Sequence, residues 1–376
     1  MPGTSLENPC ILILTDCNDL DPQILTMFKS CNFPNPIQIN NVEQLKAELK
    51  NPTGKTFITT IQEFTTKKGE IFPELSSSSK IVVFVDEAQR SLYKKVGYGK
   101  TTVKENINPD WTLNMRTAIP NALFIGFTGT PIDKNDTSTR REFGEYIDTY
   151  LPKQSIVDGG TIRIKYQERL PEVHIQESQL DVTFDSEAKK ESRIRNICKD
   201  LLEHYTTAVR PEGFKAQIVT PSKEAAITYK KILDELGAPE SEIIISSSPE
   251  EDVRTEILEY CMTKVQQRNV INKFKKPFDE DNNLAFLIVC DMLLTGFDAP
   301  IEQVIYLDKP LREQDLMQAV ARVNRPYTEN KTFGLIIDYC GISRHLKEAL
   351  EIFNEEDIAG YLEHLMDDVS KANTCK

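Results

Sequence analysis

The chain has 376 residues, of which 39% are hydrophobic, and its formal net charge at pH 7 is -13. This length allows two domains, each with its own hydrophobic core. The acidic balance argues against a chain coated in basic surface, so any contact with nucleic acid would have to be a local patch or groove. The sequence contains no run of about 18 apolar residues and no signal peptide, which predicts a soluble cytoplasmic protein.

The cysteines give no sign of a metal site or a disulfide framework. Eight of them are scattered along the chain, with no Cys-x-x-Cys pair and no histidine at ligand spacing. Structural zinc and stabilising disulfides are therefore not expected.

The first part of the chain alternates buried strands with helices. Apolar runs at residues 10–15, 57–61, 80–85 and 121–127 are typical of strands, and helical patterns precede or follow them. This alternation predicts an α/β fold with a parallel, doubly wound sheet. Ligands of such sheets bind beyond the carboxyl ends of the strands.

Two carboxylates, Asp86 and Glu87, follow one of these strands directly. Adjacent side chains on an extended stretch point in opposite directions, so the two would have separate tasks. In a nucleotide hydrolase one carboxylate holds magnesium and the next polarises the attacking water. The alternative is a strand followed by an ordinary polar loop.

One apparent phosphate-binding loop is rejected. The segment Gly54-Lys55-Thr56 has its ending, but the glycine required upstream would fall at Leu49, and Thr56 opens a strand instead of a helix. We interpret this segment as a turn.

The pattern weakens at residues 151–190, which we expect to connect two lobes, and the alternation then restarts. The predicted domains are a first lobe at residues 1–150, this connection, a second lobe at 191–345 and a helical tail at 346–376. A charged helical span at 250–277 has two interpretations, a patch for backbone phosphates or a solvated helix face. Gln318, Arg322 and Arg325 follow at spacings of four and three, so we expect them to share one helical face. Two arginines there are suited to a γ-phosphate, although they could equally be solvated.

Six short motifs, taken in order, resemble those of the motor portion of superfamily-two nucleic-acid translocases. The first four are Leu14-Thr15-Asp16, Thr59-Thr60-Ile61-Gln62, Val85-Asp86-Glu87-Ala88-Gln89 and Gly126-Phe127-Thr128-Gly129-Thr130-Pro131. The last two are Leu294-Thr295-Gly296-Phe297-Asp298 and Gln318-Ala319-Val320-Ala321-Arg322-Val323-Asn324-Arg325. Within that superfamily the chain is most similar to the R (HsdR) subunit of type I restriction-modification enzymes, over residues 9–345.

The resemblance implies two RecA-like lobes that close on ATP and Mg²⁺. It implies that Asp86 holds magnesium and that Glu87 positions the hydrolytic water. Arg325, together with Arg322, would neutralise charge on the transferring phosphoryl group, and Gln318 would orient the water or the γ-phosphate.

The resemblance also implies further site residues. Those expected to bind or sense the nucleotide are Gln89, Thr128, Gly129, Thr130, Thr295, Gly296 and Asp298. Those that resemble the family's contacts to the DNA backbone are Thr15, Thr60 and Gln62. The implied partners are double-stranded DNA and the modification and specificity subunits of a restriction-modification complex.

Two departures from the family pattern affect these expectations. Gln89 stands where the family more often has histidine. The phosphate-binding loop, its strand and the nuclease domain, which precede this segment in the family, are not in the chain. We therefore expect a truncated motor whose first lobe has an unpaired apolar strand edge beside residues 122–127, and an upstream polypeptide that supplies the loop as a further partner.

Three functions remain open at this stage. The first is a fragment of an ATP-dependent double-stranded DNA translocase that serves restriction. The second is a non-catalytic remnant, a DNA-binding or partner-binding module that lost ATP hydrolysis. The third is a strand-separating DNA helicase, which shares every motif.

Overall fold

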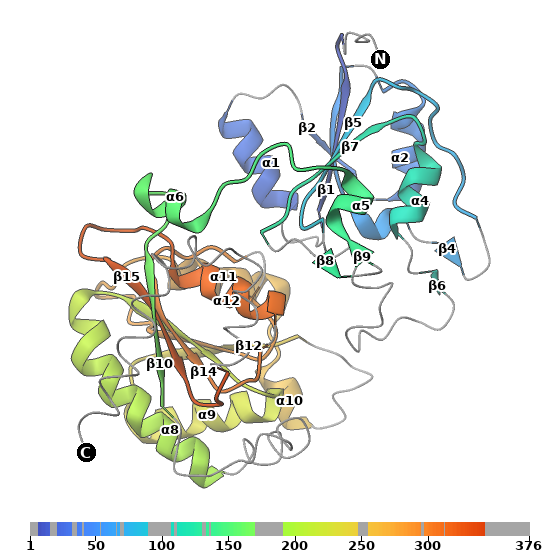
Figure 1. The fold of residues 1–376 in the computed structure, drawn as a ribbon. Helices are drawn as coiled ribbons and strands as arrows, with labels where there is room; N and C mark the ends of the chain where they lie inside the picture. The colour runs from blue at the N-terminus through green and yellow to red at the C-terminus, as the bar shows by residue number, and fades with distance from the viewer. Residues whose placement is uncertain are drawn as a thin grey trace. The chain divides into compact units, whose positions relative to one another are not determined.

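The computed structural model divides into two compact units, Met1–Thr149 and Tyr150–Lys376, each described here by itself (Figure 1). The structure describes residues 7–15, 21–31, 36–39, 41–52, 54–64, 66–67, 71–88, 107–108, 111–129, 133–134, 137–169, 191–246, 255–294, 297–311 and 313–342. Among these residues, no helix is long and apolar enough to cross a membrane.

The first unit is organised around a five-stranded sheet whose neighbouring strands all pair in parallel. Its strands, in spatial order, are β2 (Pro36–Gln38), β3 (Thr56–Thr60), β1 (Cys10–Thr15), β5 (Ile81–Val85) and β7 (Leu123–Gly126). The helices are α1 (Asp21–Ser30), α2 (Val42–Leu49), α4 (Trp111–Ala118) and α5 (Thr139–Phe143), with a 3₁₀ turn η1 (Ile61–Phe64) after β3. Two short antiparallel pairs complete it, β4 (Thr66–Lys67) with β6 (Ile107–Asn108), and β8 (Asp133–Lys134) with β9 (Thr137–Ser138).

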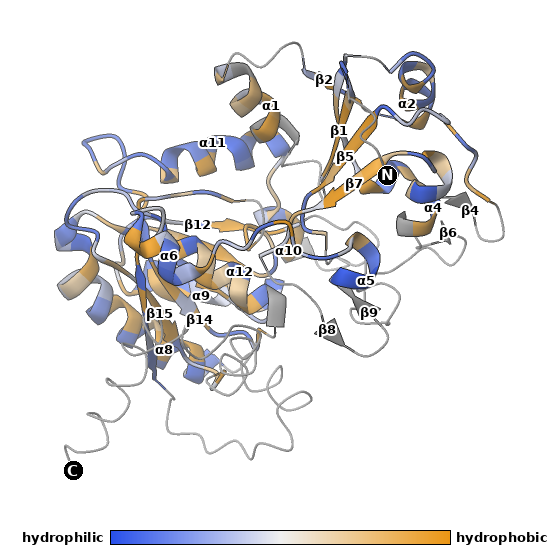
Figure 2. Ribbon diagram, turned by 45° about the horizontal axis from the view of Figure 1, so that its top comes forward, coloured by the Kyte–Doolittle hydropathy of each residue, from blue (hydrophilic) through white to orange (hydrophobic). Residues whose placement is uncertain are grey.

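The apolar runs that predicted these strands form the core of the first unit. Leu12 and Leu14 of β1, Phe57 of β3 and Val83 of β5 are fully buried, and Figure 2 shows the strands in the hydrophobic colour. A strand buried on both faces is uniformly apolar, which is why no alternation appears in its sequence.

Strand β7 lies at the edge of the sheet, as expected for residues 122–127. Within the described residues it pairs only with β5, from Leu123 opposite Val82 to Gly126 opposite Val85. Leu123 is 49% exposed and Phe127, just beyond the strand, is 55% exposed. The outer side of β7 therefore offers backbone groups flanked by apolar side chains.

The second unit contains a six-stranded parallel sheet. Its strands, in spatial order, are β10 (Arg163–Glu168), β15 (Phe333–Asp338), β14 (Glu302–Leu307), β11 (Lys215–Val219), β13 (Phe286–Val289) and β12 (Ser241–Ile244). The α-helices are α6 (Pro152–Val157), α8 (Glu191–His204), α9 (Lys223–Glu235), α10 (Thr255–Tyr260), α11 (Lys264–Phe274) and α12 (Glu313–Val323). Helix α8 continues as a π turn η4 (Tyr205–Val209) and a 3₁₀ turn η5 (Arg210–Glu212).

Helices cover both faces of the second sheet, as the α/β prediction requires. One core includes Phe274 of α11 and Leu316 of α12, and the other includes Ile197 of α8 and Ile232 of α9. Strand β10 lies inside the segment expected to connect the lobes, yet it pairs along its whole length with β15. The predicted fold class, two parallel α/β sheets, is confirmed.

Two local expectations have different outcomes. The charged span at 250–277 is not one helix, because residues 261–263 separate α10 from α11 and Thr263 caps α11 in a capping box with Gln266. The turn at Gly54 is confirmed, since its φ is +69° and the next strand begins at Thr56. The predicted tail helix lies outside the described residues.

Candidate functional site

In the first unit, several of the predicted polar residues lie at the carboxyl ends of neighbouring parallel strands, on one edge of the sheet. Thr15 at the end of β1 lies opposite Thr60 at the end of β3. The backbone N–H of Asp86 donates to the carbonyl of Leu14 at 2.9 Å, which sets the first residue after β5 beside Thr15. Parallel pairing therefore brings the tips of three sequence motifs together.

Asp86 and Glu87 form a tight turn at the end of β5. The carboxylate of Asp86 accepts from the N–H of Glu87 at 3.0 Å, and the N–H of Ala88 donates to the carbonyl of Phe127 at 2.9 Å. Glu87 has φ +48°, in the left-handed region that costs free energy for a residue with a side chain. The turn holds two half-buried carboxylates on the rim, next to the end of β7.

The threonines expected to contact DNA are less accessible than that role suggests. Thr15 is 0% exposed and Thr60 is 3% exposed, whereas Gln62 in η1 is exposed. Of the three, Gln62 alone presents its side chain at the surface of this unit. Their contact with DNA stays a prediction.

Residues expected to sense the nucleotide are only partly described in the first unit. Thr128 is half-buried and Gly129 exposed, two and three residues past the end of β7. Gln89 and Thr130 lie outside the described residues. In the second unit the same is true of Thr295 and Gly296.

Asp298 and Arg325 come together in the second unit, although 27 positions separate them in the sequence. The guanidinium Nε of Arg325 lies 3.7 Å from a carboxylate oxygen of Asp298, and both side chains are about half exposed. Phe297 and Ala299, on either side of Asp298, are buried in the core. They anchor the turn and leave Asp298 at the surface.

The expectation that Gln318, Arg322 and Arg325 share one helical face is wrong. Helix α12 ends at Val323, so Arg325 lies beyond it. The reason is local, because Pro326 disfavours the helical conformation of the residue before it. Gln318 is 8% exposed and packs among core residues, Arg322 is half-buried, and Arg325 is exposed.

One residue that the sequence analysis missed is Lys331. It is 2% exposed, and its amino group donates to the backbone carbonyls of Arg325 at 2.8 Å and Pro300 at 2.7 Å. It thereby links the segments that carry Arg325 and Asp298. A lysine in a polar loop carries no sequence signal for such burial.

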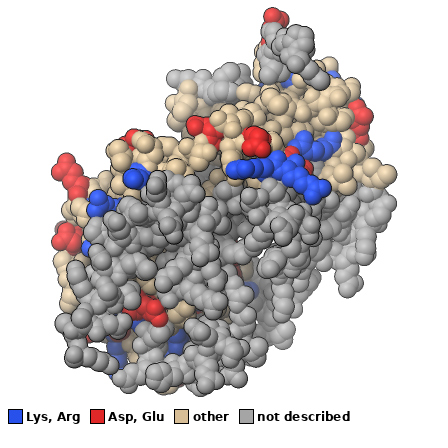
Figure 3. Space-filling model, in the orientation of Figure 1, with Lys and Arg blue, Asp and Glu red and all other residues tan. Residues whose placement is uncertain are grey.

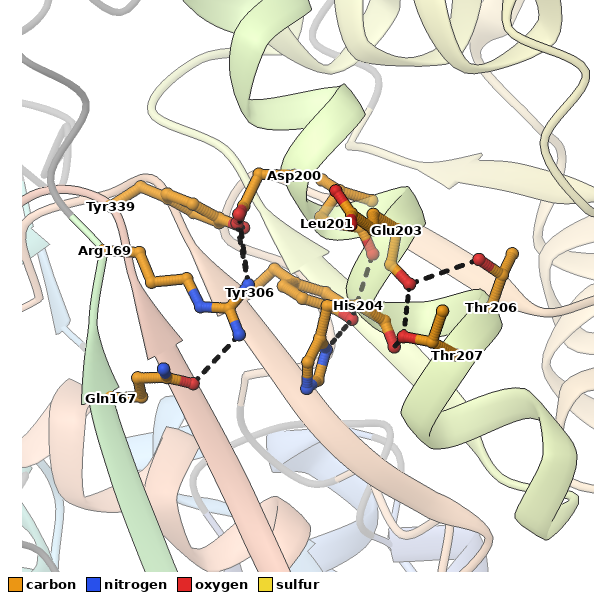
Figure 4. Close-up of polar contacts among 10 residues, drawn as sticks. All are labelled: Gln167, Arg169, Asp200, Leu201, Glu203, His204, Thr206, Thr207, Tyr306 and Tyr339. Carbon is orange, nitrogen blue, oxygen red and sulfur yellow. Dashed lines mark hydrogen bonds and ion pairs between the residues drawn. The ribbon is translucent and has the colours of Figure 1, made fainter. Parts of the chain in front are cut away.

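A second polar cluster, drawn in Figure 4, joins β10, β15 and α8. Arg169 contacts both carboxylate oxygens of Asp200 at 3.0–3.1 Å, and the hydroxyl of Tyr339 donates to the same carboxylate. His204 Nδ1 lies 2.8 Å from the hydroxyl of Tyr306. Every one of these contacts lies within the second unit, and together they fasten α8 to the sheet.

Charge on the described surface is mixed. On the face drawn in Figure 3, basic side chains of the described residues lie next to acidic ones. Among the described ion pairs, Arg116 contacts Glu142 at 3.3 Å. In the described part of the chain no group of three or more His, Cys, Asp or Glu side chains could hold a metal ion.

Comparison with known proteins assigns the family. A family model for the SWI2/SNF2 ATPase matches residues 3–196, and one for domain 3 of the type I restriction enzyme R subunit matches residues 250–341. The chain belongs to the R subunits of type I restriction enzymes, in their SWI2/SNF2 ATPase region. The predicted family is confirmed.

Two relatives of this R-subunit segment are type I restriction endonuclease subunits. The HindI endonuclease subunit of Haemophilus influenzae is 31% identical over 95% of this chain and 36% of its own length. A Methanocaldococcus jannaschii protein assigned as the MjaIXP endonuclease subunit is 32% identical over 93% of this chain and 34% of its own length. The chain thus spans about a third of the length of these curated relatives.

Two solved structures share the fold of this R-subunit segment. A fragment from Vibrio vulnificus YJ016, assigned as an HsdR subunit, has a TM-score of 0.59 at 18% identity and covers 94% of this chain and 56% of that one. The ATP-dependent type ISP restriction-modification enzyme LlaBIII, solved bound to DNA, has a TM-score of 0.56 at 14% identity over 88% of this chain and 24% of that one.

Proposed function

We propose that the chain is the motor of a type I restriction enzyme, coupling ATP hydrolysis to translocation along double-stranded DNA before cleavage. One observation carries the proposal. In a chain of the SWI2/SNF2 ATPase family, Asp86 and Glu87 stand together on the strand-end rim of the first sheet, half-buried beside the tips of β1 and β7. That edge is where parallel α/β sheets bind their ligands.

The proposed chemistry gives each of these charged side chains one role. Asp86 would hold Mg²⁺, which would supply charge neutralisation for the nucleotide phosphates, and Glu87 would orient and deprotonate the attacking water. Arg325, with Arg322, stabilises charge on the transferring phosphoryl group. The donor set fits magnesium, because Mg²⁺ is commonly held by one or two carboxylates, water and phosphate oxygens.

The DNA and protein partners are also proposals. Gln62 is exposed at the end of β3 and suits contact with a phosphate without reading bases. Thr15 and Thr60 would need neighbouring segments to move first. DNA as substrate is supported by the similarity to LlaBIII, which was solved on DNA, and by the restriction subunits among the relatives. Modification and specificity subunits are the partners that this assignment implies.

A complete phosphate-binding loop does not occur within these 376 residues. The chain has two Gly-Lys-Thr segments, at residues 54–56 and 99–101, but leucine and lysine stand where the first glycine of the loop is required. The chain spans about a third of the length of its relatives, and we propose that sequence outside these 376 residues supplies the loop, with its strand pairing along the outer side of β7.

The test adds to the chain a polypeptide that carries a Gly-Lys-Ser/Thr loop and its strand, and measures ATP hydrolysis with and without duplex DNA. We expect DNA-stimulated hydrolysis only in the mixture, and a loss of about 10²-fold or more in Glu87→Gln because the general base is removed. Glu74→Gln, an exposed carboxylate of the same unit, is the matched control. No gain over the chain alone would count against the proposal.

A second function is a binding module without hydrolysis, since neither Gly-Lys-Thr segment of these 376 residues has the upstream glycine of a phosphate-binding loop. Measuring the affinity of the purified chain for ATP separates the two, because a motor fragment should bind nucleotide at least weakly. A strand-separating helicase is distinguished by the product, since a translocase strips a third strand from a triplex without unwinding the duplex.

A further inference from the structure

Helix α12 ends two residues before Arg325. The backbone carbonyls of Val323, Asn324 and Arg325 each contact another segment of the second unit. The carbonyl of Asn324 accepts from the N–H of Ile162 at 2.8 Å, and that of Arg325 accepts from the amino group of Lys331 at 2.8 Å. The carbonyl of Val323 packs so closely on Gly334 that a Cβ there would lie 2.4 Å from it. The backbone that carries Arg325 is therefore fixed by side chain and strand contacts.

Lys331 is the side chain that joins this segment to the rest of the candidate site. Its amino group also donates to the carbonyl of Pro300 at 2.7 Å, two residues after Asp298. An ammonium group that is 2% exposed has lost its water, so these two carbonyls replace its hydration and hold it in one geometry. One side chain thus links the backbones of Pro300 and Arg325.

A buried carboxylate supports this arrangement. Glu302, the first residue of β14, is 1% exposed, and in its ionised form it favours the protonated form of Lys331. Burial raises the pKa of Glu302 to about 8 and lowers the pKa of Lys331 to about 8. No described residue donates a hydrogen bond to the Glu302 carboxylate. The two carbonyls are therefore the direct partners of Lys331.

The side-chain contact between Arg325 and Asp298 is too weak to position Arg325 by itself. Their side chains are about half exposed and the charged atoms are 3.7 Å apart. An exposed ion pair of that length contributes little, because water and salt screen it. The contacts that fix Arg325 in the structure are those of its backbone.

We propose that Lys331 is a positioning residue for the motor, which holds the Arg325 guanidinium where it can meet the transferring phosphoryl group. The inference rests on the proposed function for the role of Arg325, but the holding itself depends only on contacts within the second unit. A side chain displaced by about 1 Å can lower an enzyme's rate by about 10²-fold, so such holding matters.

The first experiment needs no nucleotide. Lys331→Met, in the full 376-residue chain, removes both donated bonds with little change in length. We expect amide hydrogen exchange of residues 324–332 to quicken by about tenfold, measured by mass spectrometry. Lys215→Met is the matched control, since Lys215 is also buried, with its pKa lowered to about 8 by burial, but donates to the carbonyl of Lys273 instead. Unchanged exchange in folded Lys331→Met would overturn the proposal.

A second, milder variant tests the proposal in case Lys331→Met does not fold. Lys331→Gln keeps a neutral amide donor that can reach at most one carbonyl, and we expect an exchange rate between those of the original protein and Lys331→Met. If Lys331→Met does not fold, exchange in Lys331→Gln equal to that of the original protein would overturn the proposal.

The second experiment asks whether Lys331 acts through Arg325. The affinity for Mg²⁺ and a fluorescent methylanthraniloyl ATP is measured for Lys331→Met, Arg325→Ala and the double variant. We expect each single variant to bind about tenfold more weakly and the double variant no more weakly than Arg325→Ala. Equal losses from Lys331→Met in both backgrounds would overturn the proposal. If neither single variant changes binding while exchange is quickened, the proposed role of Arg325 fails and the holding by Lys331 stands.

Discussion

His204 shows how a single side chain can make the fold sensitive to pH. It is half-buried at the end of α8, with Nδ1 at 2.8 Å from the hydroxyl of Tyr306 and Arg169 nearby (Figure 4). Burial, aided by the positive charge of Arg169, lowers the pKa of His204 to about 4. The folded protein therefore keeps this imidazole neutral at pH values where the unfolded chain, with a pKa near 6.5, binds a proton.

The prediction for His204 follows from that difference. Between pH 6.5 and about 4 the unfolded state binds more protons, so the contribution of His204 to stability is present above pH 6.5 and is lost as pH falls towards 4. We expect His204→Gln to unfold in urea with a weaker pH dependence across this window. Parallel curves for the variant and the original protein would contradict the assignment.

Gly334 is a residue whose lack of a side chain is required by packing. A Cβ at this position would lie 2.4 Å from the carbonyl oxygen of Val323, at the end of α12. We expect Gly334→Ala to lower the free energy of unfolding by about 1–3 kcal/mol, because the backbone of α12 or β15 must shift. Gly129→Ala is the comparison, since a Cβ there would meet nothing within 4 Å. Equal stability of the two variants in urea unfolding would show that the contact is relieved at no cost.

Helix α8 is attached to the second sheet by a buried ion pair. Arg193 contacts Asp308 at 2.6 Å and donates to the carbonyl of Tyr339 at 2.8 Å, while the hydroxyl of Tyr229 donates to the same Asp308 at 2.9 Å. The side chains of Arg193 and Asp308 are 5% and 1% exposed. Removing one partner leaves the other charge buried without compensation.

We expect Arg193→Met to cost about 3–5 kcal/mol of stability for that reason. Arg195, two positions along the same helix, pairs with Glu191 and Glu235 at the surface. Arg195→Met should leave the unfolding midpoint in urea almost unchanged, because exposed pairs are screened by water. A similar loss in both variants would mean that the network around Asp308 is not what attaches α8.

The sequence predicted strands better than it predicted side-chain placement. The run at residues 10–15 is apolar up to its last residue and forms β1 with the same bounds, and the run at 57–61 forms β3 (Thr56–Thr60), shifted by one residue. Arg325 was misplaced because helical spacing outweighed the effect of the following proline. Lys331 was missed because its burial depends on carbonyls brought from other segments, which no local pattern reveals. The pairing of Asp298 with Arg325 depends on tertiary structure in the same way.

At the scale of the whole molecule, the chain carries two separate sets of core residues. The core of the first unit includes Leu12 and Val83, and the cores of the second include Val289 and Ile197. Each unit can thus lose its packing without the core of the other being opened.

We expect calorimetry of the full chain to resolve two unfolding transitions. Gly334→Ala should lower the midpoint of one transition and leave the other in place, because Gly334 belongs to the second unit. A single transition that moves as a whole in this variant would indicate that the two units unfold cooperatively.

The outer side of β7, which is unpaired within the described residues, also affects how the purified protein should be handled. Two copies can hydrogen-bond along this flank and hide the exposed rings and aliphatic groups of Leu123 and Phe127 from solvent. Such pairing grows with protein concentration and would occupy the very place where a complementing strand has to enter. Adding a polypeptide that carries the loop should therefore succeed best in dilute solution, or when it is made together with this chain.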